Sequence, residues 1–171
     1  MTTSKTIGRE TLLSDTFDGI NSGSSITSSS FLSRYGRLET DGRNDGAVSF
    51  QEVDFSGATN ATIAIDASVL TGGFEASGRY GDSVRFELVL EDGTVILLDE
   101  FTGNGNTLHG SVTGQRIDRD GESLLWEVPE GIGAASLRIV SDISASNERL
   151  SFDNLSITCL LYTSPSPRDR G

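Results

Sequence analysis

The sequence has almost no cysteine, lysine or histidine. The one cysteine is Cys159 and the one lysine is Lys5. A single thiol cannot close a disulfide within the chain, and it excludes a metal site built from several cysteines. The only histidine, His109, has no serine nucleophile motif near it, so a catalytic role for this histidine is not indicated.

Positive charge and long hydrophobic runs are also scarce. The 13 Lys and Arg residues stand against 25 Asp and Glu residues, which gives a formal net charge of −12 at pH 7. An acidic surface disfavours nucleic acid and anionic membranes, and it suits cations or neutral partners. No apolar run is long enough to cross a membrane, and the first twenty residues contain no apolar segment of a secretory signal. An acidic, glycine-rich, lysine-poor chain suits a large bacterial protein exported by a C-terminal signal, so we expect a secreted or cell-surface location, with a cytoplasmic domain as the alternative.

The strongest fold signal is the segment 82–101, in which two apolar runs flank Asp92 and Gly93. Asp-Gly between such runs predicts a β-hairpin with a two-residue turn. One face of this hairpin is almost wholly apolar, so a second layer of structure must cover it. The residue pairs predicted to face each other are Leu90–Val95, Leu88–Leu97, Val84–Phe101, Val89–Ile96 and Arg85–Glu100.

Short alternating runs continue along the chain. Residues 60–67 place Ala61, Ile63 and Ile65 on one face, and residues 123–128 do the same for three apolar side chains including Trp126. The segment 47–55 changes phase at Gln51-Glu52, which predicts a bulge or bend, and 31–39 fits either a short helix or an irregular strand. Eight to ten short strands without a long helix predict one all-β domain, an antiparallel β-sandwich of the jelly-roll type.

The predicted sandwich covers residues 12–158. Residues 1–11 are polar, and we expect them to be loosely held. Residues 159–169 read CLLYTSPSPRD, which resembles the translation of a transposase adapter used in sequencing libraries. We therefore interpret 159–171 as a non-native tail from a metagenomic assembly and exclude it from the predicted domain.

The final predicted strand, ERLSFDNLSIT, changes phase at Asp153-Asn154, which predicts a second bulge. Together with the hairpin and the segments VSFQEVDFSGATNATIAID and SLRIVSDISASNE, it resembles extracellular bacterial jelly-roll modules. These are carbohydrate-binding modules and similar galactose-binding-like or MAM/concanavalin-like sandwiches. The resemblance implies a structural calcium ion on Asp153, joined by Asp18 near the N-terminus. The alternative is that Asp153 and Asn154 only satisfy backbone groups at the bulge.

A second calcium candidate is the segment 41–52, DGRNDGAVSFQE. It has Asp41, Asp45 and a final Glu52 at ligand positions of an EF-hand loop. Arg43 occupies a position where an oxygen ligand is needed, and the following residues have a strand pattern. The alternative is a glycine-rich turn between two strands.

A third motif, Glu52-Val53-Asp54-Phe55-Ser56, resembles the E-x-D-x-E strand of a jelly-roll glycoside hydrolase clan. Retaining hydrolysis needs two carboxyl groups about 5 Å apart. Ser56 stands where the resemblance requires the second, so we do not predict an enzyme.

Aromatic side chains are the remaining candidates for ligand contact. Tyr80, beside Arg79 in a loop, is the preferred one, and Tyr35 and Trp126 are further candidates. Trp126 shares its phase with Leu124 and Val128, which favours burial in the core.

The sequence therefore predicts a non-catalytic extracellular module that binds a glycan or another cell-surface ligand, with a structural calcium ion and neighbouring domains in a larger chain. A structural or adhesive spacer with no small ligand is the alternative. A glycoside hydrolase remnant is a weaker alternative.

Overall fold

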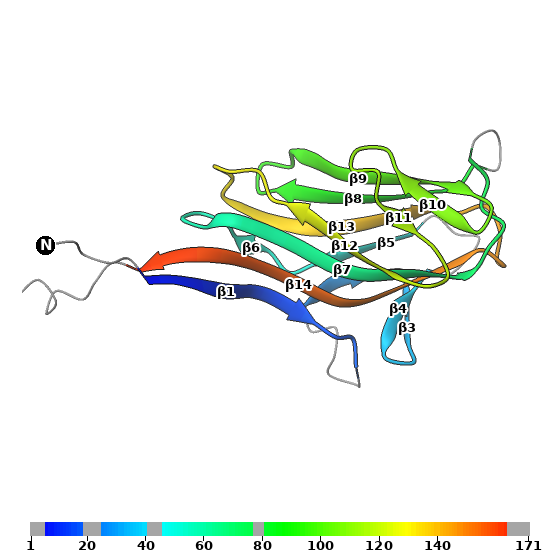
Figure 1. Cartoon of the computed structure of the whole chain (residues 1–171), viewed down its shortest axis with the longest axis horizontal. Helices are drawn as coiled ribbons and strands as arrows, with labels where there is room; N and C mark the ends of the chain where they lie inside the picture. The colour runs from blue at the N-terminus through cyan, green and yellow to red at the C-terminus, as the bar shows by residue number, and fades with distance from the viewer. Residues whose placement is uncertain (1–5, 19–24, 41–45, 77–80, 164–171) are drawn as a thin grey trace, which may run out of the picture.

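The structure is a computed structural model, and it describes residues 6–18, 25–40, 46–76 and 81–163. Within those ranges it contains fourteen β-strands and no helix, arranged as two antiparallel sheets packed face to face (Figure 1). The predicted all-β jelly-roll sandwich is confirmed.

The first sheet has six strands in the order β12-β7-β14-β4-β3, and β1 also pairs with β14. Their bounds are β1 Thr6–Asp15, β3 Leu32–Arg34, β4 Arg37–Glu39, β7 Thr59–Thr71, β12 Glu122–Glu127 and β14 Arg149–Thr163.

The second sheet has eight strands in the order β11-β10-β9-β8-β13-β5-β2, and β6 pairs with β13. Their bounds are β2 Ile26–Ser29, β5 Gly46–Phe50, β6 Val53–Asp54, β8 Ser83–Leu90, β9 Val95–Asn104, β10 Thr107–Gly110, β11 Arg116–Ile117 and β13 Ala134–Asp142.

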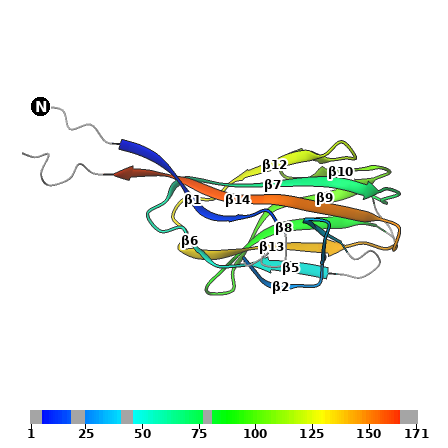
Figure 2. The same cartoon turned by 90° about the horizontal axis from the view of Figure 1, so that it is seen from below.

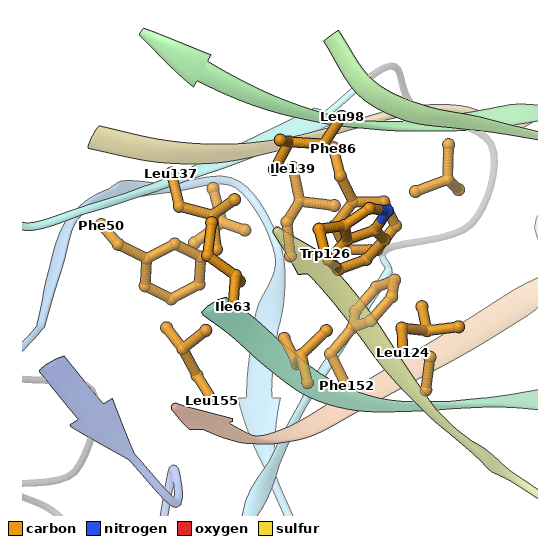
Figure 3. Packing of buried hydrophobic residues seen from close by; sticks show 14 of the residues in the cluster. Phe50, Ile63, Phe86, Leu98, Leu124, Trp126, Leu137, Ile139, Phe152 and Leu155 are labelled. Atoms are coloured by element: carbon orange, nitrogen blue, oxygen red, sulfur yellow. The ribbon is translucent and has the colours of Figure 1, made fainter. Parts of the chain in front are cut away.

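The core lies between the two sheets and is aromatic at its centre (Figure 3). Ile63 and Ile65 of β7 are fully buried, as the alternating pattern predicted. The ring of Trp126 from the first sheet packs against Phe86 from the second, with 4.5 Å between ring centroids. Phe152 of β14 contacts Phe86 edge-on at 5.9 Å. Each strand therefore buries one face and leaves the alternate side chains for the outer surface.

The β8–β9 hairpin forms where it was predicted, but its turn is longer. Leu90 N–H donates to Thr94 O, so the loop has three residues and ends at Gly93 with a φ of 86°. Val89 therefore faces Val95, one position away from the predicted register. A shift of one residue reverses the side-chain directions, which explains why Val95 is 47% exposed.

A bulge farther along the same hairpin restores the predicted pairing. The register shifts between Phe86 and Glu87, and beyond that point Arg85 faces Glu100 as predicted. The predicted interruptions at Gln51-Glu52 and at Asp153-Asn154 are also present. β5 ends before the first, and the β14 register shifts after Asp153.

Residues 31–39 form neither a helix nor one irregular strand, but the tight hairpin of β3 and β4. Tyr35 and Gly36 both have positive φ, 55° and 71°, which a two-residue turn of the I′ type requires. The hairpin extends from the sandwich, with the Tyr35 side chain 85% exposed at its tip (Figure 1). Glu39 at its base is buried, and it accepts hydrogen bonds from Arg34 and Arg149.

The first and last strands form a long antiparallel ribbon. It begins at Thr6, within the segment expected to be loosely held, and it pairs Thr6 with Thr163. Figures 1 and 2 both show β1 and β14 extending together past the end of the sandwich. β14 continues to Thr163, beyond the predicted domain limit at residue 158. Cys159, the first residue past that limit, is fully buried.

Candidate functional site

A groove of about 450 Å³ lies on the outer face of the first sheet, and most of its lining residues are polar. We call it the polar groove. Its floor is made by β7 and β14, where outward residues alternate with core residues. Arg37 of β4 lines one side, and the loop before β12 lines the other. The groove thus spans the sheet from β12 to β4.

The floor of the polar groove carries hydroxyl, amide and carboxylate groups. Ser68 of β7 and Ser151 of β14 share a hydrogen bond with 2.7 Å between their hydroxyl oxygens. Asn154 has a φ of 51° at the β14 bulge, and its Nδ2 donates to Asp66 Oδ2 at 2.8 Å. The bulge therefore positions a side chain that a regular strand would direct elsewhere.

Asp153 also lines the floor. Burial raises the pKa of its carboxyl group above the ordinary value, and the negative charges of Asp18 and Asp66 act in the same direction. The Asn154 backbone N–H and Arg37 oppose this change. The structure thus brings Asp18 within electrostatic range of Asp153, the pair implied by the resemblance to jelly-roll modules.

The two arginines of the polar groove differ in their partners. Arg119 forms no hydrogen bond or ion pair with any residue that the structure describes. Arg37 forms an ion pair with Glu39, with 3.8 Å between Nε and Oε2, and its buried Nε has no hydrogen-bond acceptor among the described residues. Arg37 and Arg119 line opposite sides of the groove, and the free guanidinium group of Arg119 can donate to a ligand.

A separate group of three carboxylates lies where the β7–β8 and β13–β14 connections meet. Glu75, Asp82 and Glu148 have carboxylate oxygens within 4.8 Å of one another, close enough to hold one metal ion. We call this group the carboxylate cluster. Asp82 fixes its position, because Oδ2 accepts from Glu75 N–H and Oδ1 accepts from Ser144 N–H, both at 2.7 Å.

The carboxylates of the cluster influence one another electrostatically. Burial, followed by the charges of Asp82 and Glu75, raises the pKa of Glu148 to about 7. None of the three carboxylates forms an ion pair with an arginine of the described residues. Clustered carboxylate oxygens are the ligands that Ca²⁺ prefers, so the residues fit a calcium ion.

The other residues singled out from the sequence are not brought to either site. Trp126 is 4% exposed and packs in the core, where a surface ligand cannot reach its ring. Arg79, Tyr80, Asp41 and Asp45 lie outside the described residues.

The remaining motif of the sequence has a local structural role. Asp54, from the segment that resembles a glycoside hydrolase strand, accepts hydrogen bonds from the backbone and hydroxyl of Ser56. These bonds lower the pKa of its carboxyl group. Asp54 therefore shapes a turn at the end of β6.

Several residues of the two sites were not identified from the sequence, namely Arg37, Asp66, Arg119 and Glu148. Each comes from a different segment, and no spacing connects them before the sheets are assembled. The only sequence feature that could have indicated the carboxylate cluster is the pair Glu75 and Asp82, which lie seven residues apart in the connection before β8.

The described residues include no helix that could span a membrane. No known family model matches the sequence, and no curated protein matches it either.

The fold, in contrast, is shared with solved structures. The K3 cleaved adhesin domain of Lys-gingipain from Porphyromonas gingivalis is 12% identical, with a TM-score of 0.55 over 87% of this chain and 99% of that one. A family 29 carbohydrate-binding module, CBM29-2, is 10% identical, with a TM-score of 0.50 over 91% of this chain and 92% of that one. In fold, the chain is therefore a jelly-roll sandwich similar to carbohydrate-binding modules and to an adhesin domain.

Proposed function

We propose that this chain is a non-catalytic glycan-binding module of a larger secreted protein, with a structural calcium ion. The polar groove carries the proposal. Its volume of about 450 Å³ falls in the range of small-molecule sites, roughly 300–1,000 Å³. It lies on a rigid sheet face, which holds the contacting groups in place.

The chemistry of the polar groove suits a sugar. Each sugar hydroxyl both donates and accepts hydrogen bonds, so a site needs both kinds of partner. Arg119 supplies an uncommitted charged donor, whereas Asp66 and Asp153 supply acceptors. Hydrogen bonds to charged groups are stronger than those between neutral groups, which supports specific recognition without an aromatic platform.

Glycan binding is tested with an array of plant, fungal and bacterial polysaccharides, followed by calorimetry on those that bind. Arg119→Ala is expected to weaken binding at least tenfold, about 1.4 kcal/mol, because it removes a charged donor from the groove. Arg9→Ala is the matched control, since Arg9 lies on β1 outside the groove and the charge change is the same. A chain that binds no glycan on the array would favour a structural spacer.

The proposed calcium ion is held by the carboxylate cluster, with Glu75, Asp82 and Glu148 as ligands. A divalent cation would offset the mutual repulsion that raises the pKa of Glu148. It would also join the β7–β8 and β13–β14 connections, so its role is to stabilise this end of the sandwich.

Thermal unfolding in chelator and in millimolar calcium tests this assignment. A hundredfold excess over Kd stabilises the folded state by about 2.7 kcal/mol, which is roughly 5–10 °C for a domain of this size. Asp82→Asn is expected to abolish the rise, whereas Asp153→Asn retains it. Loss of the rise in Asp153→Asn alone would place the ion at the β14 bulge. No rise in the unaltered chain would remove calcium from the proposal.

A further inference from the structure

We propose that the polar groove selects neutral glycans and rejects acidic ones. This inference rests on the proposed glycan-binding function and specifies its ligand class.

The charges that line the polar groove favour this selection. Two guanidinium groups, Arg37 and Arg119, face four carboxylates, which leaves two net negative charges. The carboxylates are Asp66, Asp120, Glu122 and Asp153. Protonation of Asp153 would reduce the net charge but not reverse its sign. A uronic acid or sulfated sugar would therefore enter a negative field on a chain that already carries a formal charge of −12.

The arrangement of these charges strengthens the argument. The arginines lie on opposite sides, and Asp66 and Asp153 lie on the floor between them. A ligand that reaches both arginines must therefore pass over carboxylates. Neutral hydroxyl groups can donate to these oxygens while accepting from the arginines. A ligand carboxylate has no proton to donate, so it would face repulsion on the floor.

The same mixture of charges disfavours a bare cation as the ligand. A metal ion bound between Asp66 and Asp153 would lie close to the positive charge of Arg37, which lines the same groove. The carboxylate cluster, in contrast, forms no ion pair with an arginine of the described residues. The two acidic regions thus differ in chemistry, and the polar groove is the one suited to a neutral ligand with many hydroxyl groups.

The lining of the polar groove also has no aromatic side chain. Recognition there depends on hydrogen bonds and charge, so replacing a lining carboxylate should change the ligand preference and not only the affinity. Glu122 and Asp120 are suitable for this purpose, because neither accepts a side-chain hydrogen bond from a described residue.

The test compares each glycan that binds with its derivative in which the primary hydroxyl groups are oxidised to carboxylates. Calorimetry is expected to show binding of the oxidised form weakened by about tenfold or more, with a larger difference at low ionic strength because repulsion is less screened. The double variant Asp120→Asn, Glu122→Gln should recover binding of the oxidised form severalfold. The control, Glu91→Gln with Glu127→Gln, changes the net charge equally at exposed positions outside the groove and should recover none.

The outcomes separate this inference from the proposed function. Equal or tighter binding of the oxidised glycan, or an array that yields only acidic ligands, would overturn the selection of neutral glycans and leave glycan binding in place. Equal recovery in the control variant would assign the effect to overall charge and overturn the role of the groove. Failure to bind any glycan would overturn both proposals.

Discussion

The carboxyl group of Glu148 shows how strongly the fold can alter one residue. It is 3% exposed and lies beside two other carboxylates. Its Oε2 accepts hydrogen bonds from Ala145 N–H and from the Ser144 hydroxyl group. These hydrogen bonds do not compensate for the burial of the carboxyl group and its repulsion by Asp82 and Glu75. The pKa of Glu148 is therefore about 7.

The pKa of Glu148 predicts how stability depends on pH in chelator. The folded-state pKa of about 7 exceeds the ordinary value of 4.5, so the folded state binds this proton more tightly than the unfolded state. The resulting stabilisation is complete below about pH 4.5 and is lost as the pH rises through 7. Thermal melts of the unaltered chain and of Glu148→Gln, at intervals between these limits, measure it.

The unaltered chain should become less stable relative to Glu148→Gln as the pH rises, by a few degrees in Tm. In calcium the order reverses at high pH, because the ion needs the ionised carboxylates that the Gln variant lacks. If the difference in Tm between the two chains were constant with pH, the pKa of Glu148 would not be raised in the folded state.

At the level of the elements, the carboxylate cluster depends on a close contact between β9 and the β7–β8 connection. A Cβ atom at Gly103 would lie 2.5 Å from Phe74 Cβ and 2.9 Å from Glu75 O. The Gly103 N–H also donates to Asp82 O at 3.1 Å. Glycine at this position therefore lets the backbone that carries two of the three carboxylates lie directly against the strand.

Gly103→Ala is expected to destabilise the fold by about 1–3 kcal/mol, because the added methyl group forces this backbone away from β9. It should also reduce the stabilisation by calcium, since Glu75 and Asp82 are displaced. Urea unfolding with and without calcium measures both effects. Gly133→Ala is the control, because a Cβ atom there has no neighbour within 4 Å and should change stability by less than about 0.5 kcal/mol.

Most of the elements could be predicted from the sequence, because burial of one strand face follows directly from alternation. Ile63, Ile65 and Leu124 were assigned to the correct face. The β8–β9 register near the turn was wrong, since Asp-Gly permits both a two-residue turn and a three-residue loop ending in a left-handed glycine. That choice depends on the bulge at Phe86-Glu87, which local sequence does not indicate.

The two candidate sites were less accessible to prediction. The β14 bulge was identified from the phase change at Asp153, and it does direct Asn154 to the polar groove. Arg119 and Arg37, however, are more than eighty residues apart in sequence. They line the same groove only because β7 and β14 lie between β4 and the loop before β12. The order of strands is not encoded in alternation, so no sequence pattern connects the two arginines.

At the scale of the whole molecule, Trp126 links the two sheets at the centre of the core. Its ring packs against Phe86 of the opposite sheet (Figure 3) and also contacts Phe101. Its Nε1 has no hydrogen-bond acceptor among the described residues. The indole therefore contributes through packing and not through its polar group.

Trp126→Phe should therefore be tolerated far better than Trp126→Ala, which is expected to cost about 3–5 kcal/mol as a large-to-small core change. Urea unfolding followed by circular dichroism measures both. In the unaltered chain the single tryptophan also reports on the core by fluorescence, and its transition should coincide with that of the backbone if the sandwich unfolds as one unit. Equal destabilisation by Phe and Ala would contradict this packing role, because it would show that an aromatic ring at this position adds nothing over a methyl group.

The central position of β14 in the first sheet has a consequence for how the chain folds during synthesis. This strand pairs with β7, β4 and β1, yet it is synthesised after all three of them. Until it arrives, the strand edges that it will occupy have no partner and are open to pairing with other chains. Contacts between residues so distant in sequence also form slowly. The nascent chain therefore passes through an incomplete, aggregation-prone state until β14 emerges and closes the first sheet.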